Sequence, residues 1–171
     1  EFNLRWNITR RFSVMMVGQI GMKQVLADYT SGRDYSIDYE WLKATLSYQP
    51  STNFRLTLES RGVAKENILS SGSGETCEII DIGSTFKYNQ TNKGSLQGEF
   101  KVLKIDYTGS INSAIGFEML EALRPGINYT WTIGYQKTVS KNLQITFQYL
   151  GRKSEDSRII HTGGMEIRAF F

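Results

Sequence analysis

The feature that most constrains the fold of this chain is an alternation of apolar and polar residues with a period of two. Between residues 143 and 149, Leu143, Ile145, Phe147 and Tyr149 alternate with Gln and Thr. Successive side chains of a β-strand point to opposite faces, so this pattern predicts a strand with one apolar and one polar face. The pattern recurs along the chain, and we expect strands over 2–10, 12–25, 34–48, 54–66, 77–89, 95–108, 127–139, 143–152 and 158–171.

Two of these segments change register partway. Within 34–48 the apolar positions are first odd-numbered (Tyr35, Ile37) and then even-numbered (Leu42, Leu46), and 95–108 shows a similar change. A β-bulge in each strand would restore the facing. A strand end that stands clear of the apolar zone would have the same effect, and the sequence leaves both explanations open.

The connections between the predicted strands alternate in length. The short ones lie around Arg11 and at 49–53, 90–94 and 140–142, and the longer ones at 28–33, 65–76, 109–126 and 153–157. Inside the longest connection, residues 116–123 predict two turns of helix, which Pro125 and Gly126 end. Short turns at one end and long loops at the other are typical of an outer-membrane barrel.

Strand length also favours a membrane over water. Several candidates reach about 12 to 15 residues, against five or six in a typical soluble sheet and about nine to eleven in a tilted membrane strand. Aromatic residues gather at two levels, as in the girdles of membrane barrels: Phe12, Tyr48, Phe54, Tyr88 and Tyr135 near the tight turns, and Tyr35, Tyr39, Tyr107, Tyr129 and Tyr149 towards the long loops. No apolar run approaches the roughly 18 to 20 residues of a membrane helix, which excludes a helical membrane protein.

We therefore predict an all-β fold: residues 1–171 form a single region of an antiparallel transmembrane up-and-down β-barrel. A soluble β-sandwich or lipocalin-like barrel is the alternative with the same alternation. The polar faces of the strands would point into the lumen, with the charged residues Arg5, Arg55, Glu59, Arg61, Asp81, Lys87, Glu99, Lys101, Glu166 and Arg168. These side chains either line a channel or brace the interior as ion pairs.

The last residues of the chain continue the alternation up to the C-terminus. Met165, Ile167, Ala169 and Phe171 alternate to the last residue, and this is similar to the C-terminal signal by which the barrel assembly machinery recognises bacterial outer-membrane proteins. The stretches "SLQGEFKVLKIDYTG", "GFEMLEALRPGINYTW", "NLQITFQYLGRKSEDS" and "IIHTGGMEIRAFF" resemble the C-terminal part of large outer-membrane β-barrel surface proteins of Bacteroidota. The resemblance implies a part of an exported barrel and supplies no activity.

The number of strands and the distribution of charge indicate which partners the chain has. Bacterial single-chain barrels have even strand numbers, so either segment 2–10 is not a full crossing and eight strands close alone, or the chain is part of a larger barrel, which we favour. We expect contacts with outer-membrane lipid, with the assembly machinery and with the rest of a larger barrel or other outer-membrane proteins. Loop-side cations would meet lipopolysaccharide: Arg33, Lys65, Arg152, Lys153 and Arg158. No block of Lys and Arg indicates a nucleic-acid partner.

Catalytic chemistry is not indicated. The single histidine, His161, shares the apolar face of the last strand, where we expect an interfacial ring rather than a general base. The single Cys77 reads as an incidental residue near a loop, and one His with one Cys makes no usual zinc site, so we predict no enzyme, metal or cofactor. The predicted function is the wall of a pore or transport channel in the outer membrane, with long loops extracellular and tight turns periplasmic. The alternative is a closed barrel that acts as a surface anchor or adhesin-type binding protein.

Overall fold

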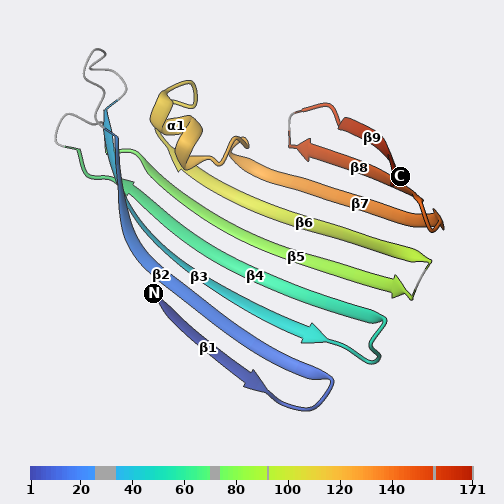
Figure 1. Ribbon diagram of the computed structural model, residues 1–171. Helices are drawn as coiled ribbons and strands as arrows, with labels where there is room; N and C mark the ends of the chain where they lie inside the picture. The colour runs from blue at the N-terminus through green and yellow to red at the C-terminus, as the bar shows by residue number, and fades with distance from the viewer. Residues whose placement is uncertain (26–33, 70–73, 92, 156, 171) are drawn as a thin grey trace.

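A computed structural model shows one antiparallel sheet whose strands follow the order of the chain (Figure 1). It describes residues 1–25, 34–69, 74–91, 93–155 and 157–170. The elements are β1 (Phe2–Asn7), β2 (Phe12–Val25), β3 (Tyr35–Tyr48), β4 (Phe54–Asn67), β5 (Thr76–Gln90), β6 (Gly94–Thr108), α1 (Ala114–Met119), β7 (Gly126–Ser140), β8 (Leu143–Ser154) and β9 (Ile160–Ala169).

Every strand pairs with its neighbours in the sequence, which confirms an all-β, up-and-down sheet of nine strands. The sheet is open: β1 and β9 form its two edges, and in the described part of the chain no ladder joins them. None of the helices in these residues is long and apolar enough to cross a membrane.

The segment between β6 and β7, which we call loop 109–125 and which contains α1, packs on one face of the sheet. We call this the covered face; it carries the odd-numbered residues of β1 to β6 and the even-numbered residues of β7 to β9. The opposite, bare face carries the other residues. The end of the sheet from which loop 109–125 leaves is the loop end, and the end with the turn at 49–53 is the turn end.

Neither register change predicted from the sequence is a β-bulge. Among the described strands, the pairing shifts only between Thr138 and Ser140, and the ladders of β3 and β6 run without a break. The strands instead continue beyond the zone in which the bare face is apolar. In both segments the apolar side chains therefore pass from one face of the strand to the other. This agrees with the second explanation, in which the end of the strand stands clear of the apolar zone.

At the loop end the covered face is apolar and forms the core of the molecule. Its buried strand residues and the loop residues that cover them form one cluster: Tyr35, Ile37, Val63, Cys77, Ile79, Ile105, Ile115, Met119 and Leu120. On the bare face at the same level the strands carry exposed carboxylates, namely Asp38, Glu40, Glu66, Glu78 and Asp106. Towards the turn end the polarity is reversed, because there the bare face is apolar: Ile82 is 62% exposed and Leu58 47%.

Several predicted boundaries need correction. β1 ends at Asn7 rather than at residue 10, because the Thr9 hydroxyl accepts hydrogen bonds from the backbone N–H groups of Arg11 and Phe12 and closes a turn. The last strand spans Ile160–Ala169 rather than 158–171. The predicted aromatic level towards the long loops is also wrong in part, because Tyr35, Tyr39 and Tyr107 lie on the covered face. The other two residues of that level, Tyr129 and Tyr149, lie on the bare face. The five aromatic residues near the tight turns lie on the bare face as well.

Candidate functional site

Loop 109–125 reaches the covered face because a short helix turns its apolar side towards the sheet. Ser113 caps α1, and its Oγ accepts a hydrogen bond from the Gly116 backbone N–H at 2.9 Å. A side chain at Gly116 would collide with the Ser110 carbonyl oxygen, so glycine is needed there. Met119 and Leu120 at the end of the helix are almost completely buried. Burying each contributes about 1.5–3 kcal/mol to docking of the loop.

The helix is shorter than predicted and lies earlier in the chain. It ends at Met119 rather than at residue 123, well before Pro125. The cause is local: Glu121 (φ 53°) and Ala122 (φ 61°) adopt left-handed backbone conformations that end the helix. For residues other than glycine such conformations cost on the order of 1–3 kcal/mol and persist only where the surroundings hold them. The turn aims the Glu121 side chain at the strands below.

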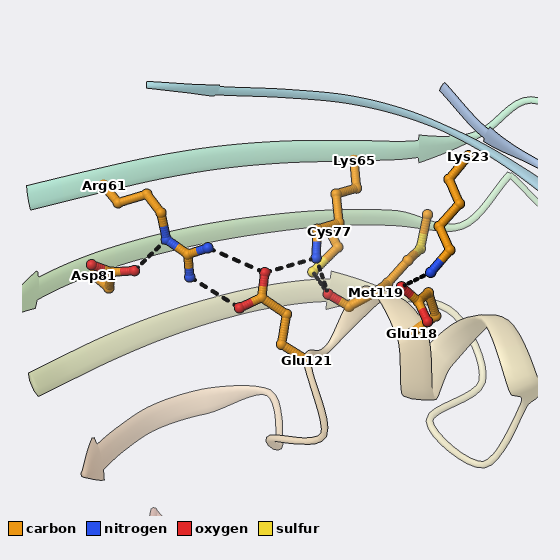
Figure 2. Close-up of polar contacts among 8 residues, drawn as sticks. All are labelled: Lys23, Arg61, Lys65, Cys77, Asp81, Glu118, Met119 and Glu121. Atoms are coloured by element: carbon orange, nitrogen blue, oxygen red, sulfur yellow. Dashed lines mark hydrogen bonds and ion pairs between the residues drawn. The ribbon is translucent and has the colours of Figure 1, made fainter. Parts of the chain in front are cut away.

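The Glu121 carboxylate is held by two cations of β4. We call Arg61, Lys65, Asp81 and Glu121 the clamp (Figure 2). Arg61 Nη2 lies 3.0 Å from one carboxylate oxygen of Glu121, and Lys65 Nζ lies 3.0 Å from the other. Asp81 on β5 orients the guanidinium from the other side, with its Oδ2 2.6 Å from Arg61 Nε. The clamp thus joins the loop to two neighbouring strands through charge-assisted hydrogen bonds.

Further contacts fasten the loop on both sides of the clamp. The Met119 carbonyl oxygen accepts from Lys65 Nζ at 3.0 Å and from Cys77 Sγ at 3.4 Å. Lys23 of β2 pairs with Glu118 at 2.6 Å. Beyond the helix, the buried Asn128 side chain donates to the Arg124 carbonyl oxygen at 2.7 Å and fixes the return of the chain into β7.

The charge state of Glu121 follows from these partners. Burial alone would raise the pKa of the carboxyl group, but hydrogen bonds from Arg61 and then Lys65 outweigh burial and lower it. Glu121 is therefore ionised at neutral pH. Its side chain remains 34% exposed, so the clamp is open to solvent on one side.

A polar cavity of about 420 Å³ lies beside the clamp on the covered face. Besides clamp residues, its lining includes Lys43, Glu59, Lys101 and Thr130. Lys43 pairs with Glu59 at 2.9 Å across β3 and β4. The cavity is therefore lined by paired charges, and one of its carboxylates, Glu121, belongs to the loop rather than to the sheet.

The structure places the charged residues predicted to face a lumen on the covered face: Arg5, Arg55, Glu59, Arg61, Asp81, Lys87, Glu99, Lys101, Glu166 and Arg168. Arg61 and Asp81 meet in the clamp, whereas Glu166 and Arg168 pair with each other on β9 at 2.7 Å. Arg55 donates to Gln49 Oε1 and lines, with Arg5, a separate polar cavity at the turn end.

The residues of the predicted assembly signal lie apart from the clamp. Met165, Ile167 and Ala169 share the bare face of β9, and Phe171 lies outside the described residues. His161 is also on the bare face, where its Nδ1 lies 2.7 Å from the Tyr149 hydroxyl.

Sequence reasoning did not identify Glu121, and it placed three other residues wrongly. Arg152, expected among the loop-side cations that meet lipopolysaccharide, lies on the covered face of β8. Lys65, expected among the loop-side cations that meet lipopolysaccharide, points to the covered face and binds the loop; Arg33 of that group lies outside the described residues. Cys77 is no incidental loop residue, because it is the second residue of β5 and fully buried beneath Met119. Its place in the odd-numbered series with Ile79 and Asp81 is the signal that would have assigned it to this face.

In the described ranges no three His, Cys, Asp or Glu side chains come together as they would around a metal ion. Comparison of the chain with known protein families, with curated proteins and with solved structures gave no match.

Proposed function

We propose that this chain forms a stretch of the wall of an outer-membrane β-barrel that serves as a pore or transport channel, with loop 109–125 folded inward as its constriction. The observation that carries the proposal is the reversal of polarity along single strands. In β5 the covered face is apolar at the loop end, with Cys77 and Ile79, and polar towards the turn end, with Asp81, Thr85 and Lys87. The bare face of the same strand carries Glu78 at the loop end and Ile82, Phe86 and Tyr88 towards the turn end.

The reversal fits a barrel wall because each part of the strand then faces a suitable solvent. A large exposed apolar patch is unfavourable in water, but the same patch is stable against lipid, where outward residues are apolar and inward residues polar. In β4 the bare face carries no charged residue from Phe54 to Ala64, a span of about eleven residues, which is close to what a tilted membrane strand needs. Beyond it, the acidic bare face would stand in water outside the membrane.

The position of loop 109–125 supports a channel role. Long connections lie at the end of the sheet that carries the acidic bare face, which we place outside the cell, and the tight turns would be periplasmic. Folded inward, the loop narrows the space along a polar wall, which a barrel without a solute path has no need to do. The lipid, assembly-machinery and larger-barrel partners inferred from the sequence belong to this same proposal.

One observation favours the surface-anchor alternative. The loop that closes over the covered face exposes Phe117 (67%) and Ile111, apolar side chains that a binding protein would present to a partner. In that case the clamp would hold the barrel shut.

Conductance of the full-length protein in planar lipid bilayers separates the two functions. We expect discrete ion currents from the wild-type protein and larger currents from Glu121→Gln, because loss of the clamp charge weakens docking of the constricting loop. Glu40→Gln, which removes an exposed carboxylate of β3 on the bare face, outside the proposed channel, is the control and should conduct like wild type. Absence of current from both wild type and Glu121→Gln would contradict the channel and leave the anchor.

A further inference from the structure

The covered face carries an excess of positive charge. Its strands contribute the cations Arg5, Lys23, Lys43, Arg55, Arg61, Lys65, Lys87, Lys101, Arg152 and Arg168, against the carboxylates Glu59, Asp81, Glu99 and Glu166. The bare face has the opposite bias, with its carboxylates near the loop end. The lining of the cavity beside the clamp is balanced while the loop is docked, with Lys43, Arg61 and Lys101 against Glu59, Asp81 and Glu121, and it gains an excess of positive charge when Glu121 leaves.

The clamp has the geometry of an anion site that is already filled. Arg61 presents Nη2 and Nη1 to the two oxygens of one carboxylate, at 3.0 and 3.4 Å, in the fork arrangement by which guanidinium groups bind carboxylates. Lys65 adds an ammonium group at 3.0 Å, and Asp81 holds the guanidinium in position from behind. The carboxylate in this site belongs to the loop, so it occupies the site only while the loop is docked.

Two features make the Glu121 carboxylate replaceable. Its backbone and that of Ala122 are left-handed, so holding the carboxylate in place has a conformational cost. In addition, Glu121 is 34% exposed and lines the polar cavity together with Arg61, whereas Lys65 is only 13% exposed and is not one of the lining residues, so a solute in the cavity meets Glu121 and Arg61 first. A free anion with the same donor needs can take the place of the side chain.

We propose that Arg61 and Lys65 form a binding site for a carboxylate-bearing anion, and that Glu121 occupies this site as a tethered substitute when loop 109–125 is docked. The inference rests on the proposed function in one respect: the anion would be the solute of the channel. Binding of the solute then displaces Glu121 and removes the ion pairs between the loop and β4, so recognition of the solute weakens docking of the constricting loop.

Isothermal titration calorimetry with succinate tests the site on the full-length protein in detergent. If the docked loop leaves the site free in no more than about a tenth of the molecules, Glu121→Gln and Glu121→Ala should each bind succinate at least about tenfold more tightly than wild type. Adding Lys65→Gln to either variant should abolish that gain. Glu166→Gln should bind succinate as wild type does.

The proposal is overturned if neither Glu121 variant gains affinity, or if the gain survives the loss of Lys65. Tighter binding of inorganic phosphate than of succinate by Glu121→Gln would overturn the carboxylate class. Because calorimetry needs no current, the two proposals fail separately. Succinate binding without conductance removes the channel and keeps the site, whereas conductance without succinate binding removes the site and keeps the channel.

Discussion

Glu121 combines two properties that seldom occur in one loop residue. Its backbone lies in a region that glycine favours, and its carboxylate bridges two cations of the sheet. The ion pairs outweigh the backbone cost only while the carboxylate is charged. Pairs this exposed contribute less than fully buried ones, so we expect Glu121→Gln to weaken docking of the loop by about 1–2 kcal/mol at neutral pH.

Acid should release the loop, because the pKa of Glu121 is lower in the docked state than its ordinary value of 4.5. A carboxylate with a lowered pKa stabilises the docked state above its ordinary pKa, and this stabilisation is lost as the pH falls through the lowered value. Pepsin cleavage after Phe117 or Leu120 in the full-length protein provides the measurement. We expect resistance at pH 4.5 and cleavage at lower pH.

In the same assay at pH 4.5, Glu121→Gln should be cleaved faster than wild type, since its side chain cannot ionise, and at lower pH the two should be cleaved alike. Glu166→Gln serves as the control and should behave like wild type. If wild type and Glu121→Gln are cleaved alike at every pH, charge on Glu121 does not hold the loop.

Half of the clamp follows from the sequence. Arg61 and Asp81 belong to strands with regular alternation, so their common face is predictable. Lys65 obeys the same alternation, but its position near a long connection led to the wrong expectation. Glu121 follows no period, because its position depends on how the loop crosses the sheet and on two backbone conformations that leave no residue pattern.

At the scale of elements, α1 is too short to be stable by itself. Its six residues make fewer than two helical turns, and isolated helices of this length do not form in water. The helix exists because its buried end covers the apolar part of β4, β5 and β6. Ser113 fixes where it begins, and packing of Met119 decides whether it stays in place.

Met119→Ala should therefore loosen the whole loop, because the residue is completely buried and its loss leaves a cavity that costs about 2–5 kcal/mol. The thiol of Cys77 lies directly beneath Met119 and reports on loop opening. We expect its reaction with a maleimide at neutral pH to be at least about tenfold faster in Met119→Ala than in wild type, if the reagent reacts only with the open state.

Phe117→Ala is the matched control, since Phe117 lies in the same helix with its side chain exposed. It should leave the labelling rate of Cys77 unchanged. Equal acceleration by both variants would mean that burial of Met119 is not what keeps the loop docked.

Most strands could be located from the sequence to within two residues, because alternation persists along their whole length. The errors lie where another interaction ends the pattern. The Thr9 hydroxyl stops β1 early, and a cap at Ser113 with left-handed residues after Leu120 shifts the helix. The register changes could be seen but not explained, since only the packing of a distant loop shows why the apolar face switches.

For the whole molecule, the switch divides the sheet into two zones with different surroundings. At the loop end it resembles a soluble two-layer structure, with a core between strands and loop and carboxylates on the outside. At the turn end the apolar side chains are on the bare face, where no described segment covers them. In the proposed function a lipid bilayer would surround the turn-end zone and leave the loop end in water.

Arginine placed at two adjacent positions of β4 tests this division. Leu58 lies on the bare face in the middle of the apolar zone, and Thr57 lies on the covered face between Ser47 and Thr85. If the bare face meets lipid, Leu58→Arg should lower the free energy of unfolding by about 2–4 kcal/mol. Thr57→Arg should change it by no more than about 0.5 kcal/mol, because its neighbours are polar.

Urea unfolding of the full-length protein in phospholipid vesicles measures both values. A harmless Leu58→Arg would place the bare face in water and remove the membrane from the proposed function, whereas a large effect at both positions would mean that the covered face is also closed to solvent.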